Sequence, residues 1–289
     1  MRNASKSVSR ATISIFAALL ALLPVQSTWA QRQPSVIPQG SSLPGLGTAE
    51  TGLNGPGYIE LGGSRSSLSG GLTDWTDAYL RAFLSGGSNG FSGEFSRQQR
   101  WGELGYWYSL GWTRTITENW YSELTAGTSS TGGRFLPKYR FDGMIHRKLL
   151  PRKQLVVSAG GGYDKSKDVN TARRFHVGGA YYFEWPFIIQ AGVTRTYAQP
   201  GSAQATSEFL ALTQGHEKEH YITVRAELGR EAYELLGGPQ TLFNFPIHNY
   251  SASYRQWIGV NWGVNLSFEH DGNPYYKRNG GVVGIFLDF

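Results

Sequence analysis

Residues 280–289 read Gly-Gly-Val-Val-Gly-Ile-Phe-Leu-Asp-Phe, and this stretch decides the fold. Counting back by twos from Phe289 reaches Leu287, Ile285 and Val283, which share one apolar face because successive side chains of a strand point to opposite sides. An alternating segment that stops on an aromatic residue is typical of the closing strand of a bacterial outer-membrane β-barrel. We expect these four residues to form the signal that the barrel-assembly machinery reads.

The first 56 residues do not share this alternation. Three basic residues open the chain, an apolar stretch follows over about residues 11–25, and small residues lead to a cleavage point after Ala30. This pattern predicts a secretory signal peptide over residues 1–30. The alternative is a membrane anchor, but its apolar core is shorter than the roughly 20 residues that a spanning helix needs. Residues 31–56 are rich in Gln, Pro, Ser and Gly and predict a flexible periplasmic arm, which leaves residues 57–289 for the barrel.

The composition excludes several classes of protein. The chain has no cysteine, so it has neither a disulfide framework nor a thiolate metal site. Its net charge is +6, and three of these charges lie in the leader, so the remainder is too weakly basic to indicate a nucleic-acid partner. The mean hydropathy is −0.33, and no apolar run after the leader is long enough for a spanning helix. A barrel remains compatible, because half of each strand faces a polar lumen.

Apolar and polar residues alternate from residue 57 to the end, as in the segment 221–228, where Ile222 and Val224 oppose Thr223 and Arg225. The pattern predicts a single antiparallel transmembrane β-barrel of about fourteen strands. Twelve strands are the alternative if the two weakest segments, 91–100 and 206–214, are not strands. The expected strands are 57–67, 75–85, 91–100, 103–115, 119–130, 137–148, 153–164, 172–184, 186–197, 206–214, 219–229, 248–257, 262–271 and 280–289.

The connections between these segments alternate in length. Even-to-odd connections are mostly short, whereas several odd-to-even connections, such as residues 230–247, are longer. Because bacterial barrels keep short turns on the periplasmic side, this alternation places both ends of the barrel domain in the periplasm. Trp120, Trp185 and Trp262 lie beside the short turns. We expect them to form an interface girdle, since an indole has an apolar body and a polar N–H.

Several turn and girdle segments carry a resemblance to a known family. These segments are residues 68–75 (Leu-Ser-Gly-Gly-Leu-Thr-Asp-Trp), Trp101-Gly102, Thr117-Glu118-Asn119-Trp120 and Leu136-Pro137-Lys138, together with the strand that ends on Phe289. From about residue 57 to the end the chain resembles the YaiO family of outer-membrane β-barrel proteins. The resemblance implies a barrel, and a role in exopolysaccharide export alongside glycosyltransferases, but it implies no catalytic residues. The chain lacks the tetratricopeptide repeats that related polysaccharide porins often carry.

Two motifs are candidates for catalysis. His216-Glu217-Lys218-Glu219-His220 fits the H-E-x-x-H zinc pattern, which requires a helix, yet the alternating segment from Tyr221 leaves no room for one. A solvated turn is therefore the expectation. His270 with Asp271 lies near the predicted outer rim, and Ser251 and Ser253 lie on a neighbouring strand, so a hydrolytic triad can be assembled on paper. No local sequence resembles a nucleophile motif, and no catalytic residue, cofactor or metal is predicted.

The phase of the alternation predicts which side chains face the lumen. Aromatic faces with Arg and carboxylate groups suit the stacking and hydrogen bonding of sugars. The same charges could instead form an interior salt-bridge lattice that braces the barrel, and the sequence favours neither reading. The candidate pore and sugar contacts are Asp77, Arg81, Trp107, Glu123, Arg140, Asp142, His176, Arg225, Glu227 and Glu269, and the wider predicted set adds Glu60, Glu94, Tyr121, His146, Arg174, Tyr182, Glu184 and Arg255.

Function is predicted less sharply than fold. A channel or accessory protein for exopolysaccharide export is the first hypothesis. A barrel enzyme that modifies lipid A or phospholipid, and a structural or partner-binding barrel without a pore, are the alternatives. The expected partners are outer-membrane lipids and lipopolysaccharide, the barrel-assembly machinery, exopolysaccharide and the proteins that make or export it, and no nucleic acid. The apolar connection 230–247 is expected either to constrict the mouth or to pack on the rim.

Overall fold

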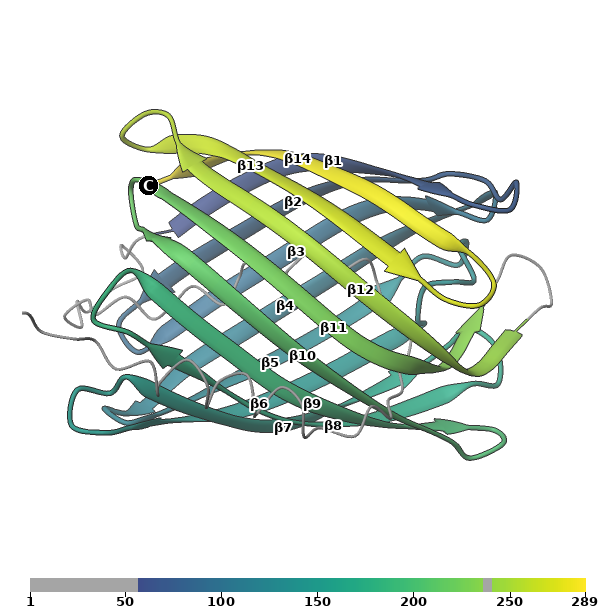
Figure 1. Cartoon of the computed structure of the whole chain (residues 1–289), viewed down its shortest axis with the longest axis horizontal. Helices are drawn as coiled ribbons and strands as arrows, with labels where there is room; N and C mark the ends of the chain where they lie inside the picture. The colour runs from purple at the N-terminus through teal and green to yellow at the C-terminus, as the bar shows by residue number, and fades with distance from the viewer. Residues whose placement is uncertain (1–56, 236–240) are drawn as a thin grey trace, which may run out of the picture.

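A computed structural model describes residues 57–235 and 241–289, so the predicted signal peptide and periplasmic arm lie outside the described residues. Fourteen antiparallel strands close into one barrel, with β1 paired to both β2 and β14 (Figure 1). This confirms the predicted fold class and removes the twelve-strand alternative. No described helix is long and apolar enough to cross a membrane. The strands are β1 Gly57–Leu68, β2 Trp75–Gly86, β3 Asn89–Arg100, β4 Glu103–Thr117, β5 Trp120–Ser129, β6 Tyr139–Leu149, β7 Leu155–Lys165, β8 Thr171–Tyr182, β9 Phe187–Gln199, β10 Ala203–His216, β11 His220–Leu235, β12 Thr241–Trp257, β13 Trp262–Gly272 and β14 Lys277–Asp288.

The wall has an apolar outside and a polar inside. Large apolar side chains are exposed on the outer face, including Leu110 at 73% and Val177 at 64%. Charged side chains are buried on the inner face, including Glu60 at 2% and Asp164 at 1%. A soluble protein has the opposite arrangement, so the outer face is adapted to lipid.

The two mouths of the barrel differ. The proximal mouth carries Gly57 and Phe289, whose backbones bond to each other, and the turns 87–88, 118–119, 150–154, 183–186, 217–219 and 258–261. The distal mouth carries the turns 69–74, 101–102, 130–138, 166–170, 200–202 and 273–276. The longest of these connections, residues 130–138, is distal. By the rule that periplasmic turns are short, the proximal mouth faces the periplasm, and both ends of the barrel domain lie there.

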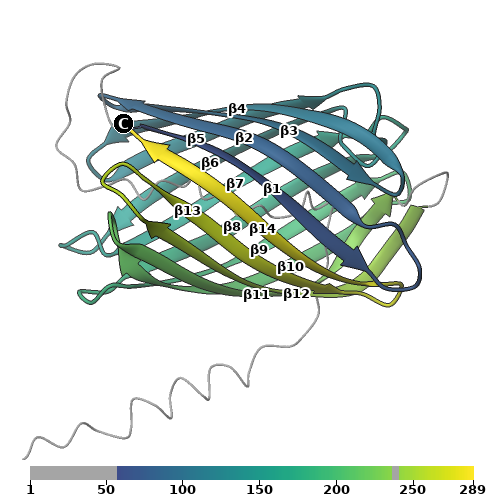
Figure 2. The same ribbon diagram turned by 90° about the horizontal axis from the view of Figure 1, so that it is seen from above.

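The predicted loop 230–247 is wrong, because most of it is strand. Strands β11 and β12 continue to pair from Arg230 opposite Pro246 to Leu235 opposite Thr241. Neither neighbour follows them: β10 pairs with β11 only up to Leu228, and β13 pairs with β12 only from His248. The extension formed by residues 229–235 and 241–247 therefore has two strands that pair with each other and with no neighbouring strand. We call it the mouth hairpin. In both views it turns from the wall into the span of the distal mouth (Figures 1 and 2).

Candidate functional site: the lumen and its distal closure

The lumen is the candidate site, and register shows how the strands bring its side chains together. Cross-strand partners share a face, so Arg81 opposite Glu94 and Arg225 opposite Ser251 face the same interior. All ten candidate contacts lie on the inward face, and so do the members of the wider set with one exception. Glu184 lies in the turn between β8 and β9, where its side chain is 69% exposed and pairs with Arg152, so its predicted lumen position is wrong. The period of two does not continue through a turn.

A first cluster joins β6, β7 and β8. The Arg174 guanidinium bonds Asp164 and also contacts Asp142 at 2.8 Å, while Arg140 contacts Asp142 at 2.5 Å. Gly162 stands between these partners, and a Cβ there would lie 2.2 Å from Asp142 Oδ1 and 2.7 Å from Arg174 Nη2. A side chain at position 162 would therefore displace the ends of Asp142 and Arg174 from their present contact. Such closely paired charges satisfy one another and leave little free field.

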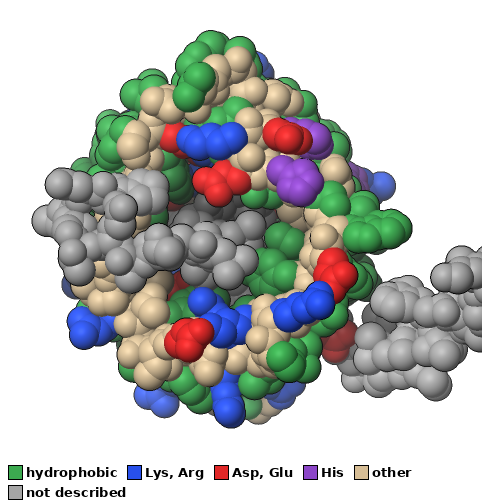
Figure 3. Space-filling view, turned by 90° about the vertical axis from the view of Figure 1, so that its left-hand side faces the viewer, with side chains coloured by type: hydrophobic (Ala, Val, Ile, Leu, Met, Phe, Trp, Pro, Cys, Tyr) green, Lys and Arg blue, Asp and Glu red, His purple; other side chains and the backbone are tan. Residues whose placement is uncertain are grey.

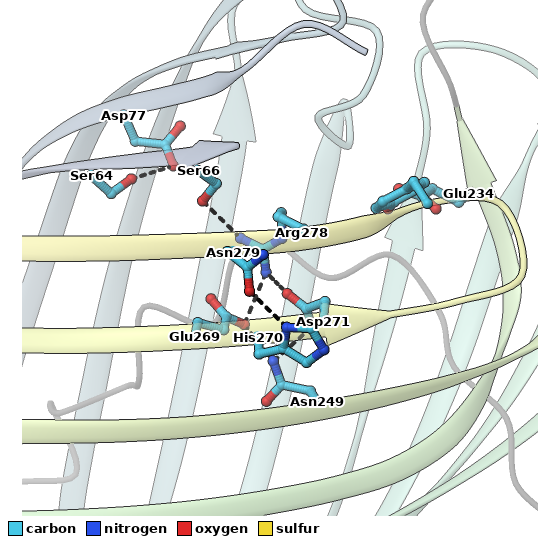
Figure 4. Close-up of polar contacts among 11 residues, drawn as sticks. Ser64, Ser66, Asp77, Glu234, Asn249, Glu269, His270, Asp271, Arg278 and Asn279 are labelled. Atoms are coloured by element: carbon cyan, nitrogen blue, oxygen red, sulfur yellow. Dashed lines mark hydrogen bonds and ion pairs between the residues drawn. The ribbon is translucent and has the colours of Figure 1, made fainter. Parts of the chain in front are cut away.

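A second cluster lies near the distal mouth, on β12, β13 and β14 (Figure 4). Arg278 bonds Asp271 and contacts Glu269 at 2.9 Å, and it reaches Ser66 of β1 at 3.3 Å. Asn249 donates to the same two carboxylates, at 2.8 Å to Glu269 and 2.6 Å to Asp271. Because Ser66 and Arg278 come from the first and last strands, this cluster also ties the closing seam of the barrel.

A third cluster ties the same seam near the proximal mouth. Arg255 lies 3.6 Å from both Glu60 and Asp288, and its guanidinium stacks 3.5 Å from the centre of the Phe286 ring. Glu60 also accepts from Tyr79 at 2.7 Å. Around the rim of this mouth, side chains of both charge signs are interspersed, with histidines on one side (Figure 3).

The remaining candidates make smaller contacts. Arg81 contacts Glu94 at 2.9 Å, Arg225 contacts Glu227 at 3.0 Å, and Asp77 accepts from Ser64 at 3.0 Å. His176 shares a hydrogen bond with Thr194, and Trp107 packs in a buried group with Phe135 and Leu136. Whether any of the ten contacts a glycan stays a prediction.

The mouth hairpin contacts the rim of the distal mouth on two sides. Ala232 and Tyr233 are fully buried and pack on the ends of β8, β9 and β10 through Ala172, Ala198 and Ala205. On the other side, Tyr276 of the β13–β14 turn donates a 2.6 Å hydrogen bond to Glu234.

Glu234 lies on the hairpin beyond the membrane-spanning wall, and burial raises its pKa to about 7 despite the Tyr276 bond and the nearby arginines. Tyr276 in turn meets Trp75 and Trp101 edge to face. The hairpin therefore spans from β8–β10 to the β13–β14 turn.

No hydrolytic arrangement forms from the candidate residues. His270 faces outward and bonds Asn279 at 2.7 Å, whereas Ser251 and Ser253 face the lumen, so the wall separates them. Inside the lumen His146 shares a 2.7 Å hydrogen bond with Ser158, but its other ring nitrogen is 3.8 Å from Glu123, beyond hydrogen-bonding distance.

The H-E-x-x-H segment is not helical. It ends β10 and starts β11, which confirms the predicted turn. Within residues 57–235 and 241–289, no three His, Asp or Glu side chains are grouped to hold a metal.

Sequence reasoning missed Asp164, Arg278, Tyr233 and Glu234 as members of these clusters. The predicted connection over residues 272–279 contains Arg278, although the inward phase of β14 extends back to it. Tyr233 and Glu234 fell inside the predicted loop. The tryptophans Trp120, Trp185 and Trp262 are 36%, 76% and 44% exposed at the proximal end, and their role as a girdle stays a prediction. Val283, Ile285, Leu287 and Phe289 face outward at 52–60% exposure, and their reading by the assembly machinery also stays a prediction.

The closed barrel with its apolar outer face defines an outer-membrane β-barrel protein of a Gram-negative bacterium. A family model described as the YaiO membrane beta barrel domain matches residues 56–234, and the chain belongs to this family. This confirms the resemblance seen in the sequence. No curated protein matches the chain.

Solved structures of outer-membrane channels share the fold at very low identity. The CymD monoaromatic hydrocarbon channel is similar with a TM-score of 0.52 and 9% identity, over 83% of this chain and 88% of that chain. The P. putida toluene transporter TodX has a TM-score of 0.53 and 10% identity, over 81% of this chain and 90% of that one. The Ralstonia pickettii toluene transporter TbuX has a TM-score of 0.53 and 7% identity, over 81% and 88%. At these identities the likeness concerns the fold alone.

Proposed function

We propose that this protein is a channel, or the accessory of a channel, for exopolysaccharide export across the outer membrane. The observation that carries the proposal is the polar lining of the lumen between its two mouths. Small hydroxyl side chains occupy the inward positions there, such as Ser96, Ser109, Thr194, Thr223 and Ser267. A fourteen-stranded barrel lies between the filled eight-stranded size and the open channel of sixteen or more strands, so a narrow pore is sterically allowed.

The pairing of the charges supports a particular class of cargo. Arginines and carboxylates face each other at contact distance in all three clusters, so the lumen offers hydrogen bonds with little net field. A neutral or weakly charged glycan suits such a surface better than a strongly charged polymer. The ring of Phe209, on which Arg225 stacks at 3.8 Å, adds an apolar surface of the kind that sugar rings pack on.

A barrel without an open pore is the second candidate, and the docked mouth hairpin favours it. An enzyme is the third reading, and the separation of His270 from Ser251 by the wall argues against it. We therefore infer a non-enzymatic protein.

A strain that lacks the gene tests the proposal against both alternatives. The expected result is less polysaccharide outside the cell and more in the periplasm, with an unchanged lipid A mass spectrum. Complementation with the wild type should restore export, whereas a variant that adds bulk at two inward hydroxyl positions, Ser109→Trp/Thr223→Trp, should reach the outer membrane without restoring it. Unchanged polysaccharide with altered lipid A would replace the proposal with the enzyme reading. No change in either would leave the barrel without a pore as the better account.

A further inference from the structure

The lipid-facing wall carries a group of tyrosines and basic residues at the distal ends of β6–β9. Register joins them, because Tyr139 is opposite Lys165, and Arg173 is opposite Tyr163 on one side and Tyr197 on the other. Directly paired side chains on one face lie about 5 Å apart at Cβ, so the group is continuous. We call it the distal patch: Tyr139, Tyr163, Lys165, Arg173, Arg195 and Tyr197.

The described part of the chain places no acid within 4.0 Å of the cations of the distal patch. Among the described residues, neither Lys165 nor Arg173 makes an ion pair within 4.0 Å, whereas the lumen arginines do. Arg195 is held along the wall by Thr206 at 2.6 Å and lies 5.6 Å above the Tyr197 ring. Asp168, in the turn next to Lys165, is engaged by Ser166 and Asn170.

The patch lies at the edge of the apolar band. One or two outward positions closer to the middle of the barrel, the same strands carry Phe141, Phe175, Val177 and Val193, which are 52%, 57%, 64% and 43% exposed. Side chains at that edge meet lipid headgroups. Because the proximal mouth faces the periplasm, the distal mouth faces the outside of the cell. The headgroups at the distal patch are therefore those of the outer leaflet.

We propose that the distal patch binds the phosphates of lipid A, the membrane anchor of lipopolysaccharide. A guanidinium forms paired hydrogen bonds with a phosphate, an ammonium adds a point charge, and tyrosine hydroxyls are further donors. The acyl chains of the same molecule lie against Phe175 and Val177, which gives a lipid an advantage over soluble phosphate. The outward arginines at the proximal end, Arg114 and Arg147, do not form such a group. They stand on separate strands, and the guanidinium carbon of each lies over a tryptophan ring, 6.0 and 5.2 Å from the ring centre respectively.

Native mass spectrometry of the full barrel in detergent tests this assignment. The probes are lipid A with its two phosphates, the same lipid A after phosphatase treatment, and inorganic phosphate. The variant Lys165→Gln/Arg173→Gln should bind phosphorylated lipid A about 30-fold more weakly than the wild type, since each basic residue near an anionic surface contributes roughly a factor of five. The matched variant Arg114→Gln/Arg147→Gln removes the same charge at the proximal end and should bind within about twofold of the wild type. Cold and heated electrophoretic mobility confirms that each variant is folded.

Three outcomes would overturn the assignment. Equal losses in the two double variants would mean that only total charge matters. Equal binding of dephosphorylated lipid A would mean that the acyl chains alone are recognised. Saturable binding of inorganic phosphate as tight as that of lipid A would make the patch a site for a soluble anion. None of these results depends on whether the lumen conducts a glycan.

Discussion

The replacement Tyr233→Ala tests whether the mouth hairpin is docked as the structure indicates. Tyr233 is fully buried against Ala172, Ala198 and Ala205. A buried aromatic side chain removes 150–250 Å² from solvent, and at about 25 cal/mol per Å² its loss costs about 4 kcal/mol. The hairpin pairs with neither neighbouring strand, so this cost should fall on docking and not on the barrel. Docking should therefore weaken by a factor of about a thousand.

Limited trypsin digestion of the folded barrel measures this change, with mass spectrometry following cleavage after Arg230 on the hairpin. We expect cleavage to be faster by about a hundredfold or more in Tyr233→Ala, because proteolysis reports the population of the open form. The resistance of the barrel wall to urea should be unchanged. Tyr250→Ala is the matched control, since Tyr250 faces outward and is 48% exposed. If Tyr233→Ala is cleaved at the wild-type rate, or if the wall unfolds with it, the hairpin is not a separately docked element and the reasoning fails.

Three further changes have definite expected outcomes. Gly162→Ala should lower the free energy of unfolding in urea by about 3 kcal/mol, because its Cβ would displace the Asp142 carboxylate from Arg174. The control Gly281→Ala, whose Cβ would meet nothing closer than 3.7 Å, should change that free energy little. Equal effects of the two substitutions would contradict this account. The hairpin should undock as the pH rises from about 4.5 to 7, because docking raises the pKa of Glu234 to about 7 and so favours its protonated form. The rate of trypsin cleavage, divided by the rate for Glu234→Gln at the same pH, should rise over this range, and a constant ratio would contradict the role of Glu234. Phe289→Ala should reduce the yield of assembled barrel in outer membranes without changing the stability of the barrel that does assemble, and an unchanged yield would show that this residue carries no assembly signal.

The period of two made the strands and their inward faces predictable. Both doubtful segments, 91–100 and 206–214, proved to be strands, β3 and β10. Inward side chains such as Arg81 and Asp142 follow from phase alone, because a closed wall has only two faces. Their exposed neighbours, such as Leu80 and Phe141, follow from the same count.

Two features could not be predicted from the sequence. The cluster of Arg174 with Asp142 and Asp164 depends on the register among three strands, which a single sequence does not encode locally. The mouth hairpin could not be predicted because its inward and outward positions are both partly apolar. A strand and a loop therefore give similar sequence patterns there. Its burial comes from contacts with strands distant in the chain, such as that of Ala172 with Tyr233.

Single-channel recording of the barrel in a planar bilayer, with a neutral glycan added on one side, tests the central claim most directly. The account predicts rare openings in the wild type, frequent openings in Tyr233→Ala, and reversible block of those openings by the glycan. A folded Tyr233→Ala barrel that is cleaved rapidly after Arg230 yet stays silent, or that conducts without any block by glycan, would contradict the export-channel account.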